Sequence, residues 1–140
     1  MRSIFTVVRV VNQGAETLGL DKSAIIAMYA VRQLGTARPS GVASACALDQ
    51  STISRHLKAL EDKGLISRSP DPDDGRAQQV SLTDSGEKLL ADNDELRLER
   101  LTAALDGWSA DERAELAHSI GRLADSLIIA NARQQVGIPI

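Results

Sequence analysis

The hydrophobic positions of the chain follow helical spacing over much of its length. Over residues 3–18, apolar side chains recur three and four positions apart, which predicts a first helix. A second helix is expected over residues 22–34, because Asp21 can cap its first turn and the apolar spacing continues beyond it. Gly19 and Gly35 end these two segments.

The middle of the chain predicts two shorter helices and a hairpin. Residues 41–46, with Ser40 as the expected N-cap, predict a third helix, and residues 50–63 predict a fourth. Alternating residues at 65–69 and 77–82 flank a turn rich in proline and aspartate, which is typical of an antiparallel hairpin. The expected fold class is therefore mainly α with one small β-hairpin.

The last third of the chain predicts two longer helices. Thr83 is placed to cap a helix over residues 84–105, and Gly107 interrupts the pattern after it. Ser109 and Glu112 have the spacing of a capping box, which predicts the start of the last helix. Four apolar residues recur on one face of that helix: Leu116, Ile120, Leu123 and Leu127.

Composition is that of a small globular protein. The 140 residues are 43% hydrophobic and 25% charged, so we expect one domain with its own core. Aromatic residues make up only 2%, so the core must be aliphatic, which favours packed helices. We expect neither a signal peptide nor a membrane-spanning segment. The single cysteine, Cys46, excludes an internal disulfide and fits a cytoplasmic location.

The net charge of −3 is unevenly distributed along the chain. Residues 1–54 carry five basic and three acidic side chains, whereas residues 84–140 carry six basic and eleven acidic ones. Because the excess of acid lies in the last third, the first two thirds can still approach a polyanion.

The helix expected over residues 50–63 separates an apolar face from a polar one. At 100° per residue, Ile53, Leu57 and Leu60 share one side, which is expected to pack on the core. The opposite side carries a hydroxyl group and two cations, those of Ser51, Arg55 and Lys58, and the hydroxyl residues Thr52 and Ser54 lie on its flanks. Such a face suits a DNA major groove, with the amides of the helix N-terminus directed at phosphate. An ordinary solvated helix face explains the same pattern equally well.

The hairpin adds two arginines, Arg68 near its start and Arg76 just past its tip, which can reach a neighbouring DNA backbone or minor groove. Three carboxylates, those of Asp71, Asp73 and Asp74, oppose this approach. At least one of them is expected to pair with an arginine, and Asp74 with Arg76 is the nearest pair in sequence. The alternative is an acidic hairpin tip without a binding role.

These segments together resemble the MarR family of transcriptional regulators. Residues 48–66 are similar to the family's recognition helix, and residues 68–76 are similar to its wing. The wing match includes an Asp-x-Arg element at Asp74 and Arg76, and residues 81–86 resemble the start of the family's long helix. The flanking helices match the family only in length and order.

The resemblance implies a winged helix-turn-helix with flanking dimerisation helices, all within one MarR-type domain. Residues 21–83 would form the winged helix-turn-helix, 84–105 the long connecting helix, and 1–20 and 106–140 the dimerisation helices. The resemblance also implies a homodimer that binds a pseudo-palindromic operator in double-stranded DNA. It further implies a pocket for a small-molecule effector, whose identity the sequence does not reveal.

We therefore predict a sequence-specific transcriptional regulator, acting as a repressor that an effector releases. The predicted DNA-binding residues are Gln50, Ser51, Thr52, Ser54, Arg55, Lys58, Arg68 and Arg76, with Asp74 as wing support. Arg55 can donate two hydrogen bonds to a guanine, and Lys58 suits a phosphate. By resemblance, Arg76 enters the minor groove. Ala47 departs from the family, whose turn often has glycine at this position.

Other functions have less support in the sequence. A protein-interaction dimer of the same fold without DNA binding is the alternative, favoured by the net negative charge and the acidic hairpin tip. No nucleophile–base pair, phosphate loop or metal-ligand spacing is readable, so we predict no enzyme, no metal site and no cofactor. Cys46 is expected to be buried packing rather than a redox switch. His56 is expected to be partly buried rather than a phosphate contact.

Overall fold

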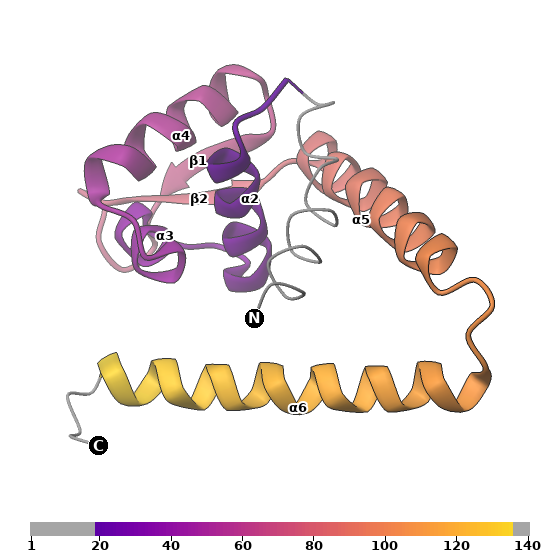
Figure 1. Ribbon diagram of the computed structural model, residues 1–140. Coiled ribbons are helices and arrows are strands. Elements are labelled where there is room, and N and C mark those ends of the chain that lie inside the picture. The colour runs from indigo at the N-terminus through magenta and orange to yellow at the C-terminus, as the bar shows by residue number, and fades with distance from the viewer. Residues whose placement is uncertain (1–18, 136–140) are drawn as a thin grey trace. The chain divides into compact units, whose positions relative to one another are not determined.

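The computed structural model describes residues 19–135, so the helix expected over residues 3–18 lies outside the described residues (Figure 1). The described chain is mainly helical with one hairpin, which confirms the expected fold class. Its elements are α2 (Lys22–Leu34), α3 (Pro39–Cys46), α4 (Gln50–Asp62), β1 (Ile66–Pro70), β2 (Gln78–Leu82), α5 (Asp84–Ala104) and α6 (Ala110–Gln135). The chain is divided into two compact units, with the boundary between Leu101 and Thr102 near the end of α5.

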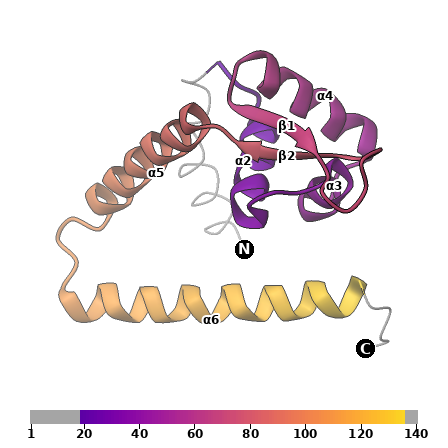
Figure 2. The same cartoon turned by 180° about the vertical axis from the view of Figure 1, so that it is seen from behind.

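The first unit is built around an aliphatic core. Helices α2, α3 and α4 contact one another, and the hairpin packs against all three of them (Figure 2). Side chains from every one of these helices, from β2 and from α5 are completely or almost completely buried: Ile25, Met28, Val31, Val42, Ile53, Leu57, Leu60, Val80 and Leu90. The hydrophobic effect on these side chains holds the three helices, the hairpin and the start of α5 in one body.

Strands β1 and β2 pair antiparallel, with Arg68 opposite Val80 and Pro70 opposite Gln78. The loop before α3 joins this hairpin through Ala37. Its N–H donates to the Val80 carbonyl at 3.1 Å, and its carbonyl accepts from the Val80 N–H at 2.8 Å. The hairpin is therefore attached by backbone hydrogen bonds to the segment that links α2 and α3.

Most of the predicted helix starts are confirmed. The Asp21 carboxylate accepts a hydrogen bond from the Ser23 N–H at 2.9 Å, as expected of an N-cap. Ser109 and Glu112 form the reciprocal capping box, with N···O distances of 2.7 Å and 3.3 Å. The expectation of Ser40 as N-cap of α3 is wrong. Arg38 takes that position, because a proline directly after it fits the first helical turn, where no amide partner is needed.

The end of α4 and the start of α5 meet at a close backbone crossing. The Thr83 hydroxyl donates to the Gly64 carbonyl at 2.7 Å and accepts from the Gly86 N–H at 3.1 Å. A Cβ atom on Gly86 would lie 2.1 Å from the Leu65 carbonyl oxygen, so only glycine fits there. The Leu65 N–H is itself bonded to the Leu60 carbonyl, which explains why β1 begins one residue later than expected.

A polar network joins α2 to α5 within the first unit. The Tyr29 hydroxyl donates to an Asp94 oxygen at 2.5 Å and accepts from the Asn93 amide at 2.9 Å. Arg32 donates to the other Asp94 oxygen at 2.9 Å. Burial, together with the bond to Asp94, raises the pKa of the Tyr29 hydroxyl. The direction in which α5 leaves the core is therefore fixed by hydrogen bonds as well as by apolar packing.

Helix α6 belongs to the second unit and buries almost none of its surface. Between Ala110 and Ala130, only Leu116 is partly covered. The stripe of apolar residues on this helix is thus left open to solvent, with exposed fractions of 56% for Ile120, 48% for Leu123 and 60% for Leu127. Among the described residues, no helix combines the length and hydropathy needed to cross a membrane.

Candidate nucleic-acid interface

The turn between α3 and α4 is short and strained. Ala47 ends α3 in the left-handed region, with φ 52° and ψ 40°. Glycine adopts this conformation without cost, whereas a Cβ atom makes it unfavourable. The departure from the family pattern noted in the sequence is therefore a position of backbone strain, and the surrounding fold holds it in place.

Asp49 organises the first turn of α4. Its Oδ1 atom accepts from the Thr52 N–H at 2.8 Å and from the Ser51 hydroxyl at 2.5 Å. Its Oδ2 atom accepts from the Thr52 hydroxyl at 2.6 Å. The bonds from Ser51 and Thr52 hold the pKa of the Asp49 carboxyl well below its usual range. Both hydroxyl protons are therefore directed at Asp49, so each hydroxyl oxygen can only accept. The Thr52 oxygen accepts a long hydrogen bond from Arg55, and the Ser51 oxygen remains available to a ligand.

This cap changes one expectation about α4. The sequence suggested that the amides of the helix N-terminus are available to a phosphate. The structure places the Asp49 carboxylate on the Thr52 amide instead, so the N-terminus is partly occupied and carries a negative charge. Asp49 was not among the helix caps expected from the sequence. An aspartate directly before the first residue of an amphipathic helix is the signal that identifies it as a cap.

The outward face of α4 presents the predicted polar residues. Arg55 is exposed, and its guanidinium donates only a long hydrogen bond, 3.4 Å, to the Thr52 hydroxyl. Within residues 19–130, no carboxylate pairs with Arg55. Lys58 lies 3.3 Å from Asp62 in an exposed i,i+4 pair, which water and salt weaken readily. Gln50, Ser51 and Ser54 are also exposed, and Thr52 is partly covered.

The inward face of α4 anchors the helix as predicted. The side chains of Ile53, Leu57 and Leu60 have no exposed surface. His56 lies at the border of this face and is partly buried, as expected. A helix that is buried on one side and polar on the other can enter a groove without disturbing its own core.

The two hairpin arginines differ in their surroundings. Arg68 is only 24% exposed and forms an ion pair with Glu61 of α4, with an N···O distance of 2.9 Å. Arg76 is exposed, and its backbone N–H, not its guanidinium, bonds to Asp74 Oδ1 at 3.1 Å. Arg68 therefore fastens β1 to α4, while the Arg76 side chain is free of carboxylate partners within the described chain.

A tip carboxylate pairs with an arginine, as expected, but Asp74 with Arg76, the nearest candidate pair in sequence, is wrong. The Asp74 side chain accepts a hydrogen bond from the backbone N–H of Arg76, two residues later, which is a common interaction of aspartate in turns. The carboxylate that pairs with an arginine is Asp71, whose Oδ2 lies 2.6 Å from the Nε atom of Arg38. These two residues are 33 positions apart, so spacing within the hairpin could not identify the partner.

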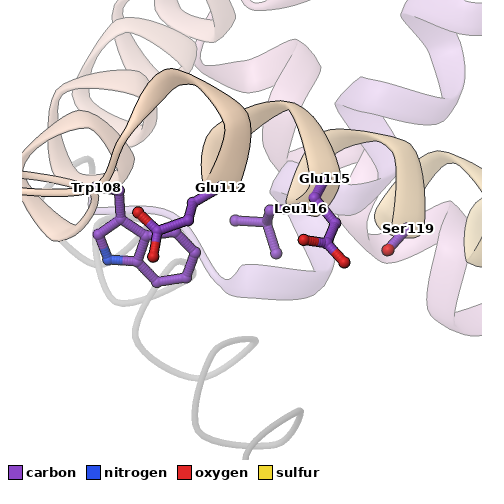
Figure 3. A pocket seen from close by; sticks show the side chains of 5 residues that line it. All are labelled: Trp108, Glu112, Glu115, Leu116 and Ser119. Carbon is purple, nitrogen blue, oxygen red and sulfur yellow. The ribbon is translucent and has the colours of Figure 1, made fainter.

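Other predicted or candidate sites contribute little to this surface. Cys46 is partly buried against the core, and burial raises the pKa of its thiol, which disfavours the reactive thiolate. The residues that the structure describes contain no cluster of three or more potential metal ligands. A shallow depression of about 270 Å³ lies along α6 and the residues before it (Figure 3). Trp108 lines this depression beside Glu112 and is 43% exposed.

Comparison with known proteins gives both sequence and structural relatives. The sequence profile of the MarR family matches residues 20–77. The HTH-type transcriptional regulator YxaD of Bacillus subtilis is 35% identical over 112 residues, which cover 80% of this chain and 78% of that protein.

Two solved structures illustrate the shared fold. The apo form of MarR from E. coli has a TM-score of 0.74 at 24% identity, covering 87% of this chain and 93% of that one. BpsR of Bordetella bronchiseptica, whose DNA binding is regulated by 6-hydroxynicotinic acid, has a TM-score of 0.62 at 23% identity, covering 89% of each chain.

Proposed function

This chain belongs to the MarR family of transcriptional regulators and has its winged helix-turn-helix fold, and from that premise we propose that it binds double-stranded DNA sequence-specifically as a homodimer. Helix α4 enters the major groove, and the hairpin β1–β2, hereafter the wing, reaches the adjacent minor groove. Each protomer reads one half of a pseudo-palindromic operator, with half-sites roughly 34 Å apart. No catalysed reaction and no cofactor are part of this function.

The observation that carries the proposal is the state of Arg55. Its side chain is exposed on a helix whose opposite face is completely buried, and no carboxylate among the described residues neutralises it. A guanidinium in this setting can donate two parallel hydrogen bonds to O6 and N7 of guanine. Because the helix cannot rotate without exposing Leu57, the direction of Arg55 is set before DNA arrives.

The neighbouring residues divide into base-reading and backbone-binding groups. The hydroxyl oxygens of Ser51 and Thr52, whose protons are held by Asp49, act as acceptors toward exocyclic amino groups of bases. Lys58, with a weak exposed partner, binds a phosphate as a point charge. Arg76 supplies the wing contact, whereas Arg68 contributes mainly by holding the wing against α4 through Glu61.

The homodimer is supported by the uncovered apolar stripe of α6. Ile120, Leu123 and Leu127 are each about half exposed in the single chain, and such a stripe favours burial against a second copy. In this arrangement α6 contributes to dimerisation, and α5 connects the dimer interface to the winged helix-turn-helix. The molar mass in solution, measured by light scattering, tests this assembly directly.

We further propose that the dimer represses transcription and that a small molecule releases it. A ligand that binds better to a dimer with a different spacing of its two α4 helices weakens operator binding by that difference in affinity. Regulation of DNA binding by a small acid in BpsR supports this class of control.

Two alanine variants test the role of α4. Arg55→Ala is expected to lower affinity for the operator by about 10-fold or more while leaving affinity for random DNA little changed. Lys58→Ala, one turn along the same exposed face, is the matched control and is expected to weaken binding to both DNAs alike. If Arg55→Ala weakened both equally, the base-reading role of Arg55 would be wrong.

A protein-interaction dimer of the same fold remains the second candidate. The net charge of −3 and the acidic wing tip favour it. If that were the function, the wild-type protein would not prefer operator DNA over random DNA. Arg55→Ala would then leave its affinity for both DNAs unchanged.

A further inference from the structure

The tip of the wing is organised around one buried carboxylate. The Asp71 side chain is only 2% exposed, although it belongs to a surface turn. Its Oδ1 atom accepts from the backbone amides of Asp73 and Asp74, at 2.8 Å and 3.2 Å. Its backbone N–H donates to the Ala77 carbonyl at 3.0 Å. Asp71 therefore holds both sides of the turn that carries Arg76.

Arg38 fixes this turn to the rest of the protein. Its Nε atom donates to Asp71 Oδ2 at 2.6 Å, and this bond is the main reason that the pKa of Asp71 lies well below its usual range. The residue before it, Ala37, is bonded through its backbone to Val80 of β2. The loop before α3 therefore contacts the wing at two points. Ala37 forms a backbone bridge to β2, and Arg38 forms an ion pair at the tip.

The Gln79 side chain also bonds to Asp71 from within the hairpin, but among the described residues Arg38 is the only side chain outside the hairpin that bonds to this turn. The ion pair of Arg68 with Glu61 lies in the middle of β1 rather than at the tip, and the Asp74 side chain bonds only to the backbone N–H of Arg76. An exposed turn that contains one glycine and three aspartates would otherwise sample many conformations. A contact by Arg76 would then require the turn to be ordered at the moment of binding, which weakens affinity.

We propose, resting on the DNA-binding function above, that Arg38 is a positioning residue for the wing: through Asp71 it fixes the tip from which Arg76 reaches DNA. Arg38 itself makes no DNA contact in this arrangement. Its guanidinium neutralises the charge of Asp71, which reduces the repulsion between the acidic wing tip and a DNA phosphate.

A direct contact between Arg38 and a phosphate is the competing explanation, because the Arg38 side chain is 47% exposed. The two explanations predict opposite changes in DNA affinity for the substitution Asp71→Asn. If Arg38 touched phosphate, Asp71→Asn would free its guanidinium and remove a negative charge near DNA, so binding would tighten. If Arg38 acts through Asp71, the same substitution loosens the wing and weakens binding.

The test measures the affinity for operator DNA of the wild-type protein and of three single variants: Arg38→Ala, Asp71→Asn and Arg76→Ala. Two double variants combine Arg76→Ala with either Arg38→Ala or Asp71→Asn. Asp71→Asn keeps an oxygen for the two turn amides and so preserves the fold. Asp73→Asn, which removes the same charge from an exposed side chain that accepts no hydrogen bond within the described chain, is the matched control. Thermal unfolding of each variant verifies that it is folded.

Arg38→Ala and Asp71→Asn are each expected to lower affinity by about 10-fold in the wild-type background and by less than about 2-fold when Arg76 is already alanine. Asp73→Asn is expected to leave binding unchanged or slightly tighter. Arg38→Lys is expected to recover part of the loss, because an ammonium can still pair with Asp71.

Two results would overturn this role and remain distinguishable from a failure of the proposed function. The first is tighter operator binding by Asp71→Asn. The second is that the fold-losses of operator affinity from Arg38→Ala and Arg76→Ala multiply in the double variant. Either result would mean that Arg38 contacts a phosphate directly, while the protein would still bind its operator. Absence of any operator preference in the wild-type protein would overturn the DNA-binding function, and the positioning role with it.

Discussion

Helix α4 and the wing present exposed arginines by different physical means. Arg55 stands on a helix fixed by three buried aliphatic side chains and a local cap at Asp49. Arg76 stands on a turn fixed by a buried carboxylate and an arginine from another part of the chain. The first arrangement depends mainly on apolar burial, which tolerates changes of pH and salt, and the Asp49 cap adds to it. The second depends on polar contacts of one carboxylate, so a single polar substitution at Asp71 or Arg38 can weaken it.

The largest effect is expected from removing the apolar anchor of α4. Leu57→Ala should lower the free energy of unfolding by about 2–5 kcal/mol, because it empties a completely buried site. Chemical denaturation measures this loss. Lys58→Ala, the neighbouring exposed position, should change stability by less than about 0.5 kcal/mol. Equal effects at the two positions would contradict the assignment of buried and outward faces.

The junction that both regions share should be the next most sensitive. Gly86→Ala places a methyl group against the Leu65 carbonyl, where α4 ends and β1 begins, and should cost about 1–3 kcal/mol. Gly41→Ala in α3 is the matched control, since nothing lies within 4 Å of the added atom. That variant should be unchanged or more stable by up to about 1 kcal/mol, measured by the same denaturation.

The carboxylate that holds the wing tip should make stability depend on pH. Because the pKa of Asp49 at the start of α4 is lowered as well, the contribution of Asp71 is isolated by comparing wild-type protein with Asp71→Asn. The pKa of Asp71 is lowered in the folded protein, so its carboxylate contributes stability that is complete above the unfolded pKa, about 3.9, and is lost as pH falls through the folded pKa. Wild-type protein should unfold at a higher temperature than Asp71→Asn from pH 7 to 5, and the difference should shrink at lower pH. A difference that stays constant down to pH 2 would show that the Asp71 charge does not stabilise the fold.

The smallest effect concerns the turn before α4. Ala47→Gly should raise the free energy of unfolding by about 0.5 kcal/mol, because relief of left-handed strain exceeds the added flexibility of the unfolded chain. Ala45→Gly, inside α3, should instead lower it by about 0.5–1 kcal/mol. Thermal denaturation of the two variants compares the same chemical change in two backbone conformations. A loss of stability in both would mean that Ala47 is not strained.

The same contrast explains how far the sequence could predict the structure. The face of α4, the cap at Asp21 and the capping box at Ser109 follow from residues within one or two helical turns, and sequence reasoning identified them correctly. The partners Arg38 and Asp71 are 33 positions apart, and Tyr29 and Asp94 are 65 apart. Nothing in their local pattern connects them, because such pairs are determined only when the core has assembled.

The candidate site divides in the same way. The outward position of Arg55 was predictable from helical periodicity alone. The role of Arg68 as a partner of Glu61 was not, because the direction of its side chain depends on how β1 packs against α4. Similarly, the choice between Asp71 and Asp74 as the paired carboxylate depends on the backbone of the turn, which the sequence does not specify.

The most direct measurement is the affinity of the purified protein for the DNA upstream of its own gene and for random DNA, at several salt concentrations. We expect the protein to bind the upstream fragment at least about 10³-fold more tightly than random DNA, with both affinities falling steeply as salt rises. Equal affinity for the two DNAs at every salt concentration would contradict the claim that α4 reads bases.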